Sequence, residues 1–149
     1  MLGEPRGFRK LRVWQTADEL AFRLCPLAGT FSGAYRWLAP QVVRAAVSVP
    51  ANIAEGYARA SRREYLHHLS IARGSLAETD YLTHFLHRSG VLSTKQYKEL
   101  DELTVKAGSE LYSLIRALSM KLEAEGRVQQ EYRLKEEPDF EYGDAPEDE

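Results

Sequence analysis

Apolar residues recur every three or four positions over four successive stretches of this chain, a spacing that is typical of amphipathic α-helices. Two capping boxes, each a serine followed three residues later by a glutamate or glutamine, mark the starts of the third and fourth stretches. Glycines near the ends of these stretches indicate where the helices stop. The predicted helices begin near Leu11, span 38–59, run from Ser61 and Glu64 to Gly90, and run from Ser93 and Gln96 to Gly126 with helical residues trailing toward Leu134. The pattern predicts an all-α fold, an antiparallel up-and-down four-helix bundle.

The predicted helix at 38–59 is apolar around most of its circumference, which is typical of a buried helix. Its polar residues fall on one narrow stripe because they are spaced by three or four positions. This stripe contains Gln41, Arg44, Ser48, Asn52, Glu55 and Arg59. Since buried polar groups need partners, we expect the stripe to lie in the bundle interior or between subunits, where its members satisfy one another. We predict that the geometry of assembly is set by Ser48, Asn52, Glu55 and Arg59.

Pro50 and Gly74 lie in the middle of predicted helices, where both oppose helix formation. Pro50 lacks an amide hydrogen, so we expect a kink near residues 46–50. A kink with a functional role and one that only shapes packing are equally compatible with the sequence. Gly74 lowers helix propensity by about 1 kcal/mol relative to alanine. We expect the close approach of another backbone to compensate for it.

Composition and charge divide the chain into a basic body and an acidic tail. Its 149 residues fit one domain, and the net charge of −2 combines a net +5 over 1–134 with a net −7 over 135–149. We predict a flexible N-terminus at 1–9, the bundle at 10–126 and a disordered acidic tail at 127–149. With one cysteine, no signal peptide and no membrane-spanning stretch, the expected location is the cytoplasm.

The basic body favours a surface for nucleic acid or another partner, although an ordinary soluble surface also carries such an excess. The candidate nucleic-acid-binding residues are Arg44, Arg62, Arg63 and Arg73. Arg62 and Arg63 lie at a helix start, where the helix dipole disfavours positive charge, so we interpret them as exposed and held for a phosphate. The alternative is a salt bridge with Glu55 or Glu64. We interpret Arg59 as structural.

Nothing in the sequence predicts an enzyme or a metalloprotein. Ser48 and Ser75 have no identifiable His–Asp relay, and no glycine-rich loop could cradle a phosphate. Asp80, His84 and His87 share one helical face, but the sequence identifies no fourth ligand or supporting shell. We expect no catalytic residue, no metal and no cofactor.

Three segments resemble a known family. Residues 48–56 followed by Arg59 closely resemble the signature of the bacterial four-helix-bundle proteins named 23S rRNA intervening-sequence proteins, and the blocks at 71–78 and 11–15 are similar to theirs. The resemblance covers the chain from residue 8 to residue 122. That family includes the accessory variability determinant of diversity-generating retroelements. The resemblance implies an up-and-down four-helix protomer and a homopentameric barrel. For the retroelement branch, it also implies a basic surface that binds nucleic acid and a reverse transcriptase.

The sequence therefore favours a non-catalytic homo-oligomer, a pentamer, that binds RNA or DNA through its basic body. By resemblance, its setting is that of an accessory subunit to a reverse transcriptase, and RNA is the favoured nucleic acid. The competing interpretation is a protein-interaction scaffold without nucleic-acid binding, in which the basic excess is incidental. Salt dependence distinguishes the two, because phosphate contacts weaken steeply as salt rises.

Overall fold

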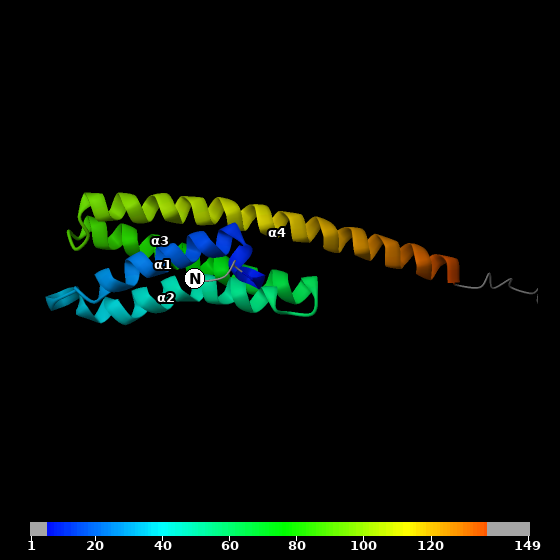
Figure 1. Ribbon diagram of the computed structural model, residues 1–149, viewed down its shortest axis with the longest axis horizontal. Coiled ribbons are helices and arrows are strands. Elements are labelled where there is room, and N and C mark those ends of the chain that lie inside the picture. The colour runs from blue at the N-terminus through cyan, green and yellow to red at the C-terminus, as the bar shows by residue number, and fades with distance from the viewer. Residues whose placement is uncertain (1–5, 137–149) are drawn as a thin grey trace, which may run out of the picture.

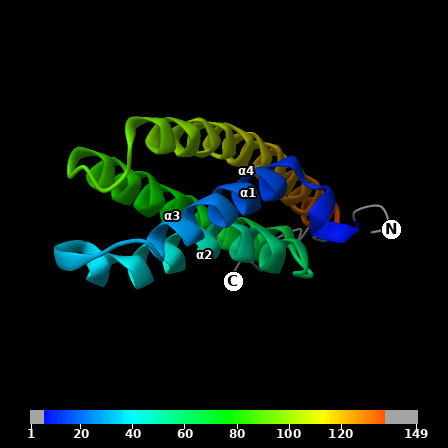
Figure 2. The same cartoon turned by 60° about the vertical axis from the view of Figure 1, so that its left-hand side comes forward.

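Four α-helices, each packed against two of the others, form the computed structural model, which describes residues 6–136 (Figure 1). The elements in order are η1 (Gly7–Lys10), α1 (Arg12–Ala28), η2 (Gly33–Leu38), α2 (Ala39–Tyr57), α3 (Arg62–Arg88) and α4 (Thr94–Glu136), where η denotes a 3-10 helix. Successive α-helices run in opposite directions, and α1 and α3 lie between α2 and α4 (Figures 1 and 2). The predicted all-α four-helix bundle is confirmed.

The helices enclose one hydrophobic core, to which all four contribute apolar residues at the predicted spacing. The largest fully buried apolar side chains are Leu20, Leu24, Val42, Val49, Ile53, Leu69, Leu86, Leu100 and Leu111. Burying a side chain of this size stabilises a protein by roughly 1.5–3 kcal/mol relative to leaving it exposed. This core fixes the faces that α2 and α3 turn toward one another and toward solvent.

The serine of each predicted capping box caps its helix, but the full reciprocal box forms at Ser93 and not at Ser61, where Glu64 bonds to the serine hydroxyl and not to its amide. Ser61 Oγ accepts a hydrogen bond from the Glu64 amide at 3.2 Å and donates one to its carboxylate at 3.0 Å. At the start of α4, Ser93 Oγ accepts from the Gln96 amide at 3.1 Å, and Gln96 Oε1 accepts from the Ser93 amide at 2.9 Å. Gly90, with φ of +77°, follows the end of α3 as predicted.

The fourth helix does not end at Gly126 but continues to Glu136 (Figure 1). A glycine inside a helix costs only about 1 kcal/mol, and the residues that follow Gly126 are mostly good helix formers. Residues 127–136, predicted as tail, are therefore helical, and 137–149 lie outside the described residues. At the other end, η1 occupies part of the predicted flexible N-terminus, and Phe8 packs edge-on against Trp14 with ring centroids 5.1 Å apart.

The residues that oppose helix formation differ in their surroundings. Pro50 is buried, and α2 continues through it. The expected backbone approach at Gly74 is wrong within the protomer, because nothing lies within 4 Å of where its Cβ would be. The close approach occurs at Gly56, where a Cβ would lie 2.8 Å from His68 Cβ and from Tyr65 Cδ2. The α2–α3 crossing thus requires a glycine at the end of α2.

Candidate functional site

The predicted polar stripe lies along the contact between α2 and α3, where it meets polar residues of α3. We call this set the polar seam: Gln41, Arg44, Ser48, Asn52, Glu55, His68, Ser75 and Glu78. Ser48 Oγ and Ser75 Oγ share a hydrogen bond of 2.8 Å, and Asn52 Nδ2 donates to the Ser48 carbonyl at 2.8 Å and to Ser48 Oγ at 3.0 Å. Toward the start of α2, Glu78 accepts from Gln41 Nε2 at 3.3 Å and pairs with Arg44 at 3.5 Å. Within the stripe, Asn52 bonds to Ser48 and Glu55 pairs with Arg59, whereas Gln41 and Arg44 find their partner on α3. No member of the stripe is buried, so the expected position in the bundle interior is wrong within the protomer.

His68 closes the seam near the α2–α3 turn. Its side chain is 13% exposed, and its Nδ1 lies 3.3 Å from Asn52 Oδ1 and 3.9 Å from Glu55 Oε2. Because the Asn52 amide oxygen can only accept, Nδ1 carries the hydrogen of this bond. Sequence reasoning missed the partners His68, Ser75 and Glu78 as a set. Their spacing places them on one face of α3, but nothing local shows that this face meets α2.

Asn52 gives the first testable prediction. Replacing it with leucine removes the donor to Ser48 and leaves the His68 hydrogen bond without an acceptor, which costs about 1–3 kcal/mol. If the stripe sets assembly, Asn52→Leu also changes oligomer size or solubility, measured by light scattering. The matched control is Gln41→Leu, the same amide-to-leucine change where the amide makes one bond of 3.3 Å. An unchanged, stable assembly in Asn52→Leu would contradict the predicted role.

The candidate arginines differ in how far their charge is already paired. Arg59 pairs with Glu55 at 2.5 Å, one helical turn away, and both side chains are exposed. Arg62 was expected to be exposed, but it is half-buried and pairs with Glu125 of α4. The sequence could not indicate this partner because 63 residues separate the two in the chain.

The other candidate arginines do not form one cluster. Arg44 is exposed and pairs with Glu78, while Arg63 and Arg73 are exposed and have no ion pair among the described side chains. Arg63 and Arg73 lie ten residues apart on α3, which corresponds to roughly 15 Å along the helix. Of the four candidate arginines, Arg44 and Arg62 are therefore paired, and the two on the rest of α3 are not.

A pocket of about 410 Å³ lies where the α2–α3 turn and the start of α3 meet α4. Its lining consists of Arg59, Ala60, Ser61, Arg62, Tyr65, Leu118 and Glu125. The Tyr65 hydroxyl is buried and has no hydrogen-bond partner among the described residues. Burial raises the pKa of this hydroxyl, and neighbouring Tyr57, whose ring packs edge-on against it at 6.2 Å, adds to the rise.

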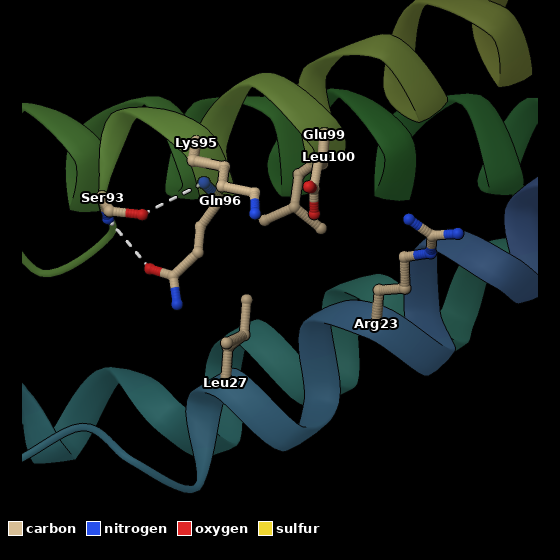
Figure 3. Close-up of a pocket in the computed structure, with 7 residues that line it drawn as sticks. All are labelled: Arg23, Leu27, Ser93, Lys95, Gln96, Glu99 and Leu100. Carbon is tan, nitrogen blue, oxygen red and sulfur yellow. Dashed lines mark hydrogen bonds between the residues drawn. The ribbon is translucent and has the colours of Figure 1, made fainter.

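A second pocket, of about 510 Å³, lies between α1 and the start of α4 and contains none of the candidate residues (Figure 3). It is lined by Arg23, Leu27, Ser93, Lys95, Gln96, Glu99 and Leu100. Ser93 and Gln96 are engaged in the α4 capping box, drawn as dashed lines in Figure 3. Arg23 donates to Glu19 at 2.5 Å, and this hydrogen bond raises the pKa of its guanidinium. The lining mixes charged, polar and apolar residues, and Arg23, Ser93 and Gln96 are already hydrogen-bonded within the protein. It therefore indicates no particular ligand.

The residues considered for a metal do not converge. Among the side chains that the structure describes, no three from His, Cys, Asp or Glu are close enough to hold a metal ion. His87 stacks on Tyr97 with ring centroids 4.4 Å apart, and its Nε2 lies 3.3 Å from Thr94 Oγ1. In the same part of the chain, no helix is long and apolar enough to cross a membrane.

Comparison with known proteins places this bundle in a family. The sequence profile of the 23S rRNA-intervening sequence proteins matches residues 9–113. The chain belongs to the 23S rRNA-intervening sequence protein family. A crystal structure of a protein of unknown function from the S23 ribosomal protein family of Bacteroides thetaiotaomicron is similar, with a TM-score of 0.65 and 26% sequence identity over 69% of this chain and 97% of that one. No curated protein matches the chain significantly.

The 23S rRNA-intervening sequence family match contains the polar seam, Arg62, Arg63 and Arg73, but not the last part of α4. Glu125, the partner of Arg62, lies beyond the matched residues. Figure 1 shows this last part of α4 extending past the α2–α3 turn. The pocket beside Arg62 therefore combines residues inside the family match with residues from beyond it.

An apolar surface lies on the outside of α2 and α3. We call it the outer face: Val47 of α2 and Ile71, Tyr81 and Phe85 of α3, all at least 37% exposed. The Tyr81 and Phe85 rings lie 6.4 Å apart, and Gly74 shares their side of α3 by its spacing. Tyr81 and Phe85 are thus in ring contact, and exposed apolar side chains on two neighbouring helices make this face a candidate for protein contact.

Proposed function

We propose that this protein is a non-catalytic homo-oligomer that binds nucleic acid, with RNA favoured, through the exposed side of α3. The observation that carries the proposal is the pair Arg63 and Arg73, whose charges are exposed and have no ion pair among the side chains that the structure describes, 6–131 and 133. A guanidinium free of an internal carboxylate keeps its donors for phosphate oxygens. The other two candidate residues, Arg44 and Arg62, already have internal partners.

The assembly proposed is a homopentameric barrel, as the resemblance to the 23S rRNA intervening-sequence proteins implies. The outer face supports a contact between copies, because it exposes apolar side chains on two adjacent helices. Gly74 has open space on this side, so the backbone approach that its sequence position predicts is available to a second copy. A ring of copies would repeat the α3 arginines around its surface and multiply weak phosphate contacts.

By the same resemblance, the proposed setting is that of an accessory subunit to a reverse transcriptase of a diversity-generating retroelement. A basic, non-catalytic surface suits this role, since it can hold RNA while another protein performs the chemistry. A neighbouring reverse-transcriptase gene with template and variable repeats would support this setting.

The test is the salt dependence of RNA binding by the full chain and by the variant Arg63→Gln/Arg73→Gln. Each phosphate contact to a single strand contributes about 0.7 to the slope of log affinity against log salt, so losing two contacts per RNA site lowers the slope by roughly 1.4. Lys98→Gln/Arg116→Gln, which removes two exposed charges from α4, is the matched control. Fluorescence anisotropy from low to high salt gives both slopes. Equal slopes in the two double variants would reject α3 as the interface.

A protein-interaction scaffold without nucleic-acid binding is the alternative function, and a specific observation favours it. Three of the arginines near the α2–α3 turn and seam, Arg44, Arg59 and Arg62, already pair with carboxylates of the same chain. The scaffold would use the outer face alone. An oligomer that binds no RNA at low salt supports the scaffold and contradicts the nucleic-acid role.

A further inference from the structure

The pocket at the start of α3 is lined by two arginines and by a tyrosine whose hydroxyl has no partner among the described residues. Arg59, Arg62 and Tyr65 all line it, and its volume of about 410 Å³ is within the range of small-molecule sites. The Tyr65 hydroxyl is buried and bonds to no described residue, although a buried hydroxyl without a partner lowers stability. This hydroxyl is the feature that packing of the bundle alone does not explain.

Both guanidinium groups keep donors for a further ligand. Arg59 uses Nη2 on Glu55, and Arg62 uses Nη1 on Glu125. A guanidinium carries five N–H donors in a planar fork, so each side chain has others to offer. The neighbouring carboxylate of Glu64 accepts from Ser61 Oγ.

The Glu125 carboxylate forms an ion pair with Arg62 and lines the same pocket. Carboxylates and phosphates bind arginine through the same donors, and a phosphate offers more charge and more acceptor oxygens. We propose that this pocket binds a phosphate group, held by Arg59, Arg62 and the Tyr65 hydroxyl, and that the phosphate takes the place of the Glu125 carboxylate on Arg62. No covalent step is involved.

The exchange links the pocket to the last part of α4. Glu125 belongs to that part of the helix, and its pair with Arg62 joins it to the start of α3. A phosphate that displaces Glu125 breaks the ion pair between α3 and α4. Because the coupling is reciprocal, a stronger ion pair weakens phosphate binding. The group can come from a nucleic-acid backbone or from a free phosphate or nucleotide. Only the first source rests on the proposed function.

The test measures binding of inorganic phosphate, a nucleoside monophosphate and single-stranded RNA to the full chain by calorimetry. Tyr65→Phe is the decisive variant, because it removes only the hydroxyl and keeps the ring that packs beside Gly56. We expect about tenfold weaker phosphate binding with no loss in unfolding temperature. Glu125→Gln should strengthen binding by roughly tenfold, which corresponds to about 1.4 kcal/mol. Arg62→Gln should abolish it, and Lys98→Gln, an exposed charge of α4 outside the pocket and outside the α3 interface, is the control.

The outcomes separate this inference from the proposed function. Phosphate binding that responds to Tyr65→Phe and Glu125→Gln supports the pocket, and a parallel loss of RNA affinity identifies the nucleic-acid backbone as its source. If only inorganic phosphate or the nucleotide responds, the source is a free phosphate. Affinity that is absent, or equal in the wild type and both variants, overturns the pocket. RNA binding that still depends on Arg63 and Arg73 would then leave the nucleic-acid proposal standing.

Discussion

Replacing Gly56 with alanine is expected to destabilise the bundle by about 1–3 kcal/mol, the range for adding a group to a well-packed contact. An added Cβ would lie 2.8 Å from His68 Cβ and Tyr65 Cδ2 and 3.2 Å from the Tyr65 carbonyl oxygen. The Tyr65 carbonyl is part of the α3 backbone, and His68 Cβ is attached directly to it. Neither atom can rotate away from the added Cβ. Relief requires α2 and α3 to move apart where the seam ends.

The size of this effect is clearest against a glycine with ordinary space. At Gly108 of α4, an added Cβ would make one normal contact, 3.8 Å from Leu76 Cδ2. Gly108→Ala should therefore stabilise the protein by up to about 1 kcal/mol through helix propensity. Urea unfolding followed by circular dichroism measures both variants. If Gly56→Ala proves as stabilising as Gly108→Ala, the close α2–α3 crossing is wrong.

Gly56→Ala also tests the seam. Moving the helices apart near the turn lengthens the His68–Asn52 hydrogen bond, already 3.3 Å, before it affects the 2.8 Å contact between Ser48 and Ser75. We therefore expect faster amide hydrogen exchange at the end of α2 than in its middle.

Local signals in the sequence predict the helices well because their causes are local. The caps at Ser61 and Ser93 depend on residues three positions apart, and both serines accept the predicted amide hydrogen bond. The role of a glycine is harder to predict, because glycine occurs both at the ends of helices and inside them. Gly90 takes a positive φ of +77° after α3, whereas Gly126 remains inside α4. Nothing in the neighbouring residues alone separates these two outcomes.

The remaining differences concern contacts between distant parts of the chain. Sequence reasoning predicted that the polar stripe of α2 would be satisfied, but not that His68, Ser75 and Glu78 would supply the partners. It placed the close backbone approach at Gly74 rather than at Gly56. It also missed the pairing of Arg62 with Glu125. Each depends on where two helices cross, which is set by packing of the whole bundle and not by spacing along one helix.

The second large effect concerns assembly through the outer face. Replacing Ile71 and Tyr81 with glutamate should convert the proposed pentamer into protomers of 16.9 kDa. Both side chains are exposed in the protomer, at 41% and 62%, so the substitutions leave the core intact. In a contact between copies, each new carboxylate would be buried without a partner, and buried unpaired charge is strongly destabilising. Repetition of the change around a closed ring multiplies the effect.

The matched control uses two exposed apolar residues that lie off the outer face. Val105→Glu/Tyr112→Glu on α4 changes side chains that are 65% and 63% exposed, with the same added charge. Light scattering should give an unchanged mass for this variant, while circular dichroism should show equal helix content in both. A mass that falls in the α4 variant and not in the α3 variant would move the contact to α4.

The assembly result also decides how the α3 arginines act. If Ile71→Glu/Tyr81→Glu yields folded protomers that bind RNA far more weakly than the assembly does, affinity arises from repetition of Arg63 and Arg73 around the ring. Two phosphate contacts per protomer then suffice, because a second copy binds the same RNA at high effective concentration. If the protomers bind RNA with the affinity of the assembly, one copy holds the complete site, and repetition around a ring is not needed for binding. Each neighbouring pair of copies in this variant carries four added carboxylates. If the variant nevertheless remains pentameric, the outer face is not the contact between copies.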